Sequence, residues 1–163
     1  MITCDILTRR EIEARIVAPL LEAFAAEVGR DRAVEIVRQV ILQIAREQGA
    51  QLVQQAGGCK LAHFTAVLEV WKDGDAMEMV VLEQNEQRLA YNVTRCGYAD
   101  MYRQLGLAEL GKTLSCGRDF ALIEGFNPEI SLTRTQTILE GAPCCDFRYQ
   151  SGRVSLPGVG PDA

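Results

Sequence analysis

The stretch MEMVVLEQNEQRLAYNVTRC, residues 77–96, decides the predicted fold, because the periodicity of the apolar residues changes there. Residues 77–84 and 88–96 have the composition and alternation of strands, and the polar Asn-Glu-Gln between them is typical of a turn. We therefore expect an antiparallel hairpin. The chain before it has helical spacing, and more strand patterns follow it.

Three helices are predicted before the hairpin. One face of the first is marked by residues four apart, namely Ile12, Ile16, Leu20 and Phe24. The second is expected to run from Asp31 to Gly49, with an apolar face of Ala33, Val34, Val37, Val40, Ile41 and Ile44. The third covers residues 61–71 and ends at the turn Lys-Asp-Gly-Asp.

After the hairpin, residues 98–114 return to helical spacing and lead to Cys116. Two further strands, 130–139 and 144–150, are joined by the turn Glu-Gly-Ala-Pro. Helices that precede strands predict the α+β class, with N-terminal helices packed on an antiparallel β-sheet. We expect one domain over residues 1–150 and a flexible tail, rich in glycine and proline, over residues 151–163.

Composition excludes several function classes. The chain has 163 residues, 48% of them hydrophobic, which suffices for one domain with a core. A net charge of −5 without a basic cluster argues against nucleic acid as a partner. No apolar run approaches the ~20 residues that span a bilayer, and the start turns charged early, so we expect a cytoplasmic protein without a membrane partner.

The segment SCGRDFALIEGFNP, residues 115–128, places a thiol and a carboxylate three positions apart. Gly117 is expected to let the backbone turn sharply after Cys116. On one helical turn, Asp119 would lie beside Cys116 and could take a proton from the thiol or from water. The structural alternative makes Cys116 a small buried hydrophobe and Asp119 a helix cap.

The strand predicted over residues 130–139 alternates hydroxyl side chains with others. Thr133, Thr135 and Thr137 would share one face, which is either a solvated sheet surface or the wall of a polar pocket. Arg134, on the other face, is either an ion-pair partner or a residue whose guanidinium holds a substrate carboxylate through two hydrogen bonds. If the next strand pairs with this one, Cys145 lies near the threonines.

Zinc is the metal to consider, because four zinc-capable residues are spread over this half of the chain: Cys96, Cys116, Asp119 and Cys145. Their spacing contains no tight ligand pair, and the single histidine, His63, falls in the apolar third helix. We therefore expect neither a metal nor another cofactor, and no Ser-His-Asp triad.

Residues 94–150, about a third of the chain, resemble the L-2-amino-thiazoline-4-carboxylic acid hydrolase family. The shared pieces, in order, are Cys-x-x-Asp, Gly-Phe-Asn-Pro, the Arg-Thr-x-Thr strand and a closing Cys-x-Phe-Arg. The resemblance implies an enzyme in which water or a thiol attacks C2 of a cyclic amidine, giving a carbamoyl-cysteine.

The resemblance also implies which residues form the site, with a small-molecule substrate as partner and a homodimer left open. The catalytic group would comprise Cys116, Asp119 and Cys145. The substrate-binding group would comprise Arg134, Thr135, Thr137 and Asn127.

Two weaker resemblances give alternative functions. Cys145, eight positions after Thr137, is similar to the ligand spacing of zinc-bearing 4-vinyl-reductase type sensor domains, which have a cysteine where this chain has Thr137. That resemblance implies a fold of this small-molecule-binding type and a non-catalytic sensor module. The Cys-x-x-Asp with the later Cys-Cys pair resembles organomercurial lyases, in which two thiols and a carboxylate cleave a carbon–metal bond.

Overall fold

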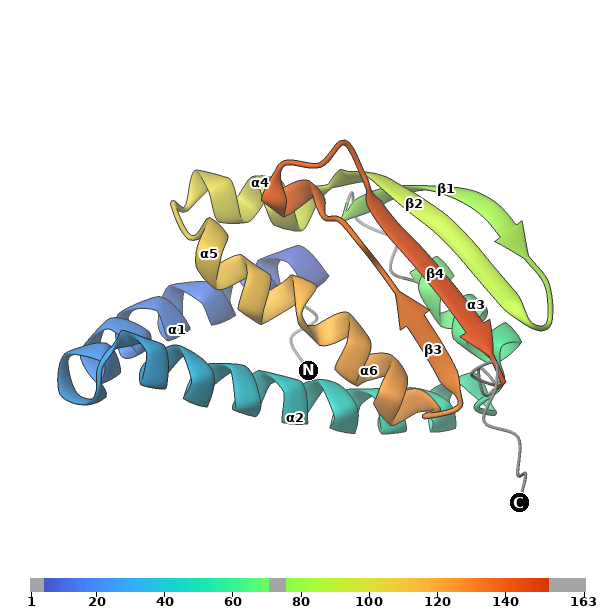
Figure 1. Cartoon of the computed structure of the whole chain (residues 1–163), viewed down its shortest axis with the longest axis horizontal. Coiled ribbons are helices and arrows are strands. Elements are labelled where there is room, and N and C mark those ends of the chain that lie inside the picture. Colours follow the sequence, from blue (N-terminus) through green and yellow to red (C-terminus); the bar gives the residue numbers. More distant parts are fainter. Residues whose placement is uncertain (1–4, 71–75, 153–163) are drawn as a thin grey trace, which may run out of the picture.

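The computed structural model describes residues 5–70 and 76–152 (Figure 1). The chain begins with three helices, which are α1 (Ile6–Val28), α2 (Arg30–Ala56) and α3 (Leu61–Val70). Figure 1 shows α1 and α2 as a long hairpin that turns at Gly29. The predicted Lys-Asp-Gly-Asp turn and nearly all of the predicted tail lie outside the described residues, so the domain boundary at 150 stays a prediction.

A four-stranded antiparallel sheet follows, in the spatial order β1-β2-β4-β3. Its strands are β1 (Met77–Gln84), β2 (Arg88–Cys96), β3 (Ile130–Thr133) and β4 (Cys145–Ser151). The predicted hairpin is present, with Met77 opposite Cys96 and Gln84 opposite Leu89. The α+β class with an antiparallel sheet is therefore confirmed. In the described part of the chain, no helix is long and apolar enough to cross a membrane.

The strand predicted over residues 130–139 is shorter than expected. β3 ends at Thr133, and the chain then leaves the sheet. The reason lies in β4, where the Asp146 carboxylate accepts hydrogen bonds from the backbone N–H groups of Thr135 and Gln136, both at 2.9 Å. These bonds take the place of ladder hydrogen bonds, so the three threonines do not form one strand face.

The segment between the hairpin and β3 contains more helices than predicted. It comprises α4 (Gly97–Gln104), α5 (Ala108–Gly111), a π turn (Lys112–Cys116) and α6 (Arg118–Phe126). Gly117 has an ordinary helical φ of −69°, so the expected sharp turn after Cys116 is wrong. Its N–H instead donates to the carbonyl of Lys112 at 2.7 Å, which closes the π turn. Single π turns of this kind are frequent at functional sites.

Two glycines bring α2 and α6 into backbone contact. α2 does not end at Gly49, as predicted, but continues to Ala56. A Cβ on Gly49 would lie 2.1 Å from the carbonyl oxygen of Leu122, and one on Gly125 would lie 2.1 Å from that of Arg46. Gly49 is therefore a packing residue inside a helix, and the contact fixes α6 against α2.

The buried side chains form two clusters. The first lies between the sheet, α3 and α6, and its aromatic members are Phe64, Tyr91, Phe126, Phe147 and Tyr149. The second lies among α1, α2, α4 and α5, and its larger members are Leu21, Ile41, Tyr102, Leu110 and Leu114. The site described below lies between these two clusters.

The apolar row that marks the first predicted helix does not face the core. Its members are each 49–56% exposed, namely Ile12, Ile16, Leu20 and Phe24. The buried face of α1 contains Ala14 and Leu21 instead. Small side chains on that face let α1 approach its neighbours closely, and the larger residues are left outside. α1 thus has two apolar faces, and only one is covered within the chain.

Candidate functional site

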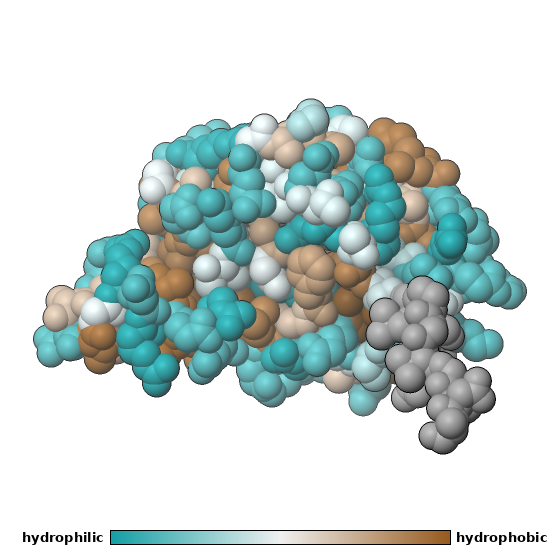
Figure 2. All heavy atoms as spheres, in the orientation of Figure 1, coloured by the Kyte–Doolittle hydropathy of each residue, from teal (hydrophilic) through white to brown (hydrophobic). Residues whose placement is uncertain are grey.

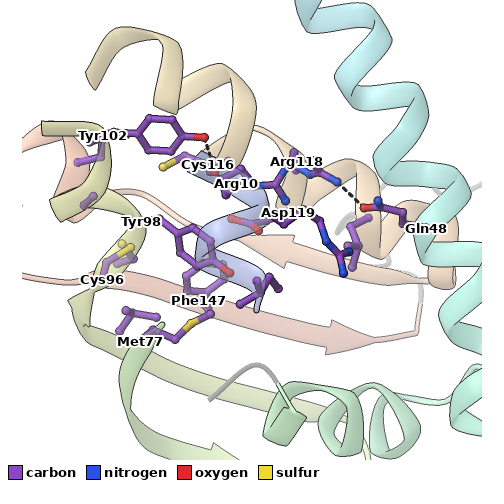
Figure 3. Close-up of a pocket in the computed structure, with 18 of the residues that line it drawn as sticks. Arg10, Gln48, Met77, Cys96, Tyr98, Tyr102, Cys116, Arg118, Asp119 and Phe147 are labelled. Atoms are coloured by element: carbon purple, nitrogen blue, oxygen red, sulfur yellow. Dashed lines mark hydrogen bonds between the residues drawn. The ribbon is translucent and has the colours of Figure 1, made fainter. Parts of the chain in front are cut away.

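A cavity of about 340 Å³ lies between the sheet and the helices. Its wall is built by residues from distant parts of the chain (Figure 3). α1 contributes Arg10, α2 contributes Gln48, α4 contributes Tyr98, α6 contributes Asp119 and β4 contributes Phe147. The size suits a small-molecule ligand.

Asp119 and Arg134 form an ion pair in this wall. Arg134 also donates to the carbonyl of Cys116 at 2.9 Å. Its guanidinium lies over the rings of Phe120 and Phe147, at 5.2 and 5.3 Å from their centroids. Both terminal nitrogens of Arg134 thus donate to groups of the protein. Of the two sequence interpretations of Arg134, the ion-pair one fits, and we do not assign it to a substrate carboxylate.

The Asp119 carboxyl has an unusual pKa. Burial raises it to about 6, although the positive charge and hydrogen bond of Arg134 act in the opposite direction. The side chain is nevertheless 31% exposed, and it lines the cavity. A carboxyl of this kind is suited to proton transfer, because it borders a cavity and its pKa lies near neutrality.

Three thiols line the same cavity, from Cys96, Cys116 and Cys145. Burial raises the pKa of Cys116 to about 12, and the negative charge of Asp119 adds to this shift. Burial likewise raises the pKa of Cys145 to about 11 and raises that of Cys96. At neutral pH all three are therefore protonated. The expectation that Cys116 and Cys145 face one pocket agrees with their placement, while their roles stay predictions.

Three of the predicted substrate-binding residues do not line the cavity. The hydroxyl of Thr135 bonds to Asp146 at 2.7 Å, and that of Thr137 bonds to Glu140 at 2.6 Å. Asn127 donates to a backbone carbonyl before α3 at 3.0 Å. Each has a hydrogen-bond partner outside the cavity lining, so we do not include these three in the proposed site.

The sequence interpretation missed the polar wall opposite the sheet. Arg118 is buried and donates to the amide oxygen of Gln48 (Figure 3). Arg10 pairs with Glu13, and the same carboxylate lies 3.9 Å from Arg118. The pairing of Arg10 with Glu13 at i, i+3 is typical of a solvated helix surface. The sequence held no signal that this helix face borders a cavity.

Two tyrosine hydroxyls complete the wall. The Tyr102 hydroxyl lies 3.0 Å from the Ser115 hydroxyl. Figure 3 shows Tyr98 on the same side of the pocket as Cys96. Burial raises the pKa of Tyr98 to about 12 and also raises that of Tyr102. Both hydroxyls are therefore neutral at physiological pH and can donate hydrogen bonds.

Metal ligation gains no support from this arrangement. Across residues 5–70 and 76–152, no three histidine, cysteine or acidic side chains are grouped so that they could hold a metal ion. The expected absence of a metal stays a prediction, to be tested by metal analysis of the purified protein.

The arrangement of an antiparallel sheet with helices around a cavity has a counterpart among solved structures. The structure is similar to the crystal structure of the phenol-responsive sensory domain of the transcription activator PoxR with phenol, with a TM-score of 0.56 and 11% sequence identity. The similarity covers 93% of this chain and 76% of that one. It confirms the predicted resemblance to 4-vinyl-reductase type domains at the level of the fold. No curated protein matches the sequence.

Comparison of the sequence with family models identifies the family of this chain. The family model described as L-2-amino-thiazoline-4-carboxylic acid hydrolase matches residues 9–149. The chain belongs to this family, as the resemblance of residues 94–150 indicated, and the match extends through the helical half, where no diagnostic motif was found.

Proposed function

We propose that the protein is a hydrolase that opens a small carboxylate-bearing cyclic amidine of the 2-amino-thiazoline-4-carboxylate type. Family membership supports the reaction class. The observation that carries the proposal is Asp119, a carboxyl with a pKa of about 6 that borders a cavity of substrate size. A group of this pKa can both accept and return a proton at neutral pH.

The reaction proceeds by attack of water at C2 of the ring. Ionised Asp119 takes one proton from the water as its oxygen bonds to C2. The bond between C2 and the ring sulfur then breaks, and Asp119 returns the proton to the departing sulfur. The second proton of the water ends on the ring nitrogen. The product is a carbamoyl-cysteine, so one water is consumed and no other reactant is needed.

The neighbours of Asp119 have supporting roles. Arg134 fixes the position of the carboxylate through their ion pair and stabilises its charged form. Cys116 is a protonated thiol beside it, suited to contact the amidine rather than to attack it, because the thiolate is the nucleophilic form. Cys145 is held by the backbone N–H of Ile138, which donates to its sulfur at 3.2 Å.

The test is a turnover assay on purified protein. The protein is incubated with 2-amino-thiazoline-4-carboxylate and related cyclic amidines, and the release of free thiol is followed. We expect catalytic release of thiol with the carboxylate-bearing ring. Tight binding without turnover over the whole panel would contradict the proposal.

A non-catalytic binding module is the second candidate. The domain of PoxR that shares the fold is phenol-responsive and was solved with phenol. A cavity with aromatic side chains could hold such a ligand here without reaction. The turnover assay separates the two candidates. Organomercurial-lyase chemistry is less favoured, because it needs thiolates, whereas burial keeps the thiols of Cys116 and Cys145 protonated.

The pH dependence of kcat/KM should report the ionisation of Asp119. Its ionised form is the active base, so kcat/KM should rise with pH up to about 6 and level off above it. Below the pKa, each pH unit should cost about tenfold in rate, since the fraction ionised falls by that factor. The measurement should run from pH 4.5 to 8, which is about 1.5 units below the pKa to about 2 units above it. A profile that is flat or that falls over this pH range would contradict the assignment.

A further inference from the structure

We propose that Arg10 and Arg118 form an anion-binding subsite that holds the carboxylate of the substrate. The substrate class rests on the proposed function. The placement of the subsite rests on the geometry of this wall alone. Figure 3 shows both arginines beside Asp119 in the same pocket, so a ligand held by them would present its ring to the carboxyl.

The charges that line the cavity do not balance. Among residues 5–70 and 76–152, four arginines line it, which are Arg9, Arg10, Arg118 and Arg134, but only two carboxylates, which are Glu13 and Asp119. Arg134 is neutralised by Asp119. Arg9 is exposed to solvent, so the buried excess is that of Arg10 and Arg118 over Glu13. A buried excess charge is costly unless a ligand of opposite sign completes it.

Arg10 and Arg118 share one counterion. Arg10 bonds to Glu13, and Arg118 lies 3.9 Å from the same oxygen of that carboxylate. Both guanidinium groups are nearly inaccessible, with side-chain exposures of 11% and 7%. Burial and the charge of Arg10 lower the pKa of Arg118 from its usual value, as expected where two cations repel each other.

One donor in this pair has no partner. Nε of Arg10 is buried and makes no hydrogen bond. Such unsatisfied buried donors are rare in folded proteins and call for an explanation. A planar carboxylate can accept two parallel hydrogen bonds from a guanidinium edge, and this is the chemistry that an unpaired Nε favours.

The test compares two probes by isothermal titration calorimetry, 2-aminothiazole-4-carboxylate and 2-aminothiazole, which lacks the carboxylate; both rings are aromatic and resist hydrolysis, so the heat reports binding alone. Wild-type protein should bind the carboxylate probe at least about tenfold more tightly, the factor of one charge-assisted hydrogen-bonded pair. Arg10→Met and Arg118→Met should abolish this preference and leave binding of the second probe unchanged. Arg15→Met, an exposed arginine of α1, is the matched control and should keep the preference.

A second variant guards against simple misfolding of the arginine variants. Glu13→Gln removes the carboxylate that the two arginines share but keeps the shape of the side chain, so affinity for the carboxylate probe should increase several-fold. Equal binding of both probes by the wild type, no binding of either, or an intact preference in Arg10→Met would overturn the inference. A preference that Arg10→Met abolishes, in a protein without turnover, would support the subsite and contradict the hydrolase.

A separate observation concerns the outer surface of α1. Residues four apart along the whole helix are large, apolar and about half exposed, and they are Ile12, Ile16, Leu20, Phe24 and Val28. On α2, exposed residues at the same spacing are Ile36, Val40 and Ile44. Figure 2 shows apolar side chains interrupting a largely hydrophilic surface at this hairpin.

We infer that this surface binds a second copy of the same chain. Eight such side chains together expose roughly 700 Å². This area exceeds the largest exposed apolar patch of a typical monomer and approaches the ~800 Å² that each partner buries in a standard interface. Rows at i±4 on two helices interdigitate in the commonest class of helix packing. Nearby Arg15 and Arg30 already pair with Glu11 and Glu22 of their own chain, so an identical surface can approach.

Sedimentation velocity tests the dimer. The wild-type protein should sediment as a dimer at micromolar concentration, and Leu20→Glu should sediment as a monomer with the same helical content by circular dichroism. Val80→Glu, at an equally exposed apolar position on β1, should remain a dimer. A monomeric wild type, a dimeric Leu20→Glu, or a monomeric Val80→Glu would overturn the inference.

Discussion

Replacing Asp119 by asparagine should lower kcat for the cyclic amidine by about 10²–10⁴-fold, the usual contribution of a general acid–base group. The amide cannot take the proton of the attacking water or return it to the sulfur. Binding should change far less, because Asp119 mainly bonds to Arg134. Thiol release under saturating substrate gives kcat, and calorimetry with the aromatic analogue 2-aminothiazole-4-carboxylate, which resists hydrolysis, gives the affinity.

The control for this variant is Asp100→Asn, which removes an exposed carboxylate of α4 outside the cavity. It should keep full turnover. The Asp119→Asn protein should also lose the rise of kcat/KM through pH 6, since that limb belongs to the missing carboxyl. Nearly full turnover in Asp119→Asn would exclude the acid–base role.

Replacing Gly49 by alanine should lower the free energy of unfolding by about 3 kcal/mol or more, at the upper end for overpacked sites. The added Cβ would lie 2.1 Å from the carbonyl oxygen of Leu122, so α6 must move away from α2. That movement displaces Asp119 and Arg118 at the start of α6, and turnover should fall as well. Urea denaturation followed by circular dichroism measures the stability.

The matched control is Ala50→Gly at the next position of α2, which is exposed. By helix propensity alone, glycine to alanine should stabilise a helix by about 1 kcal/mol, and Ala50→Gly should cost about that much. The two substitutions separate packing from propensity, because propensity predicts opposite signs. A stabilised Gly49→Ala protein would show that the helices are not in backbone contact.

The sequence predicted those parts of the fold in which local pattern and tertiary environment agree. The hairpin of residues 77–96 was found because β2 alternates between buried and solvated faces. The pattern failed where tertiary contacts decide the conformation. β3 ends early because Asp146, a residue of another strand, binds the backbone after Thr133. α2 continues through Gly49 because a second helix packs there, which no local signal records.

The residues of the candidate site also differ in whether a local sequence pattern or a tertiary contact reveals them. Cys116, Asp119 and Arg134 were singled out because they lie in a short segment with a recognisable spacing, and Cys145 because its predicted strand would pair next to that segment. All four line the cavity, and their roles stay predictions. Arg10 was not found, since a helical arginine next to a glutamate at i+3 is typical of a solvated surface. The row of α1 was visible in the sequence, but whether it faces a core or a partner depends on the other helices.

The central claim is that Asp119 activates water and that no covalent bond to Cys116 forms. The most direct measurement is thiol release from 2-amino-thiazoline-4-carboxylate by Cys116→Ser beside the wild type, with the intact mass of each protein taken after rapid quenching. We expect Cys116→Ser to keep kcat within about tenfold of the wild type, less than the loss of a general acid–base group, and neither protein to carry an added mass. A dead Cys116→Ser, together with a substrate adduct on Cys116 of the wild type, would contradict the claim.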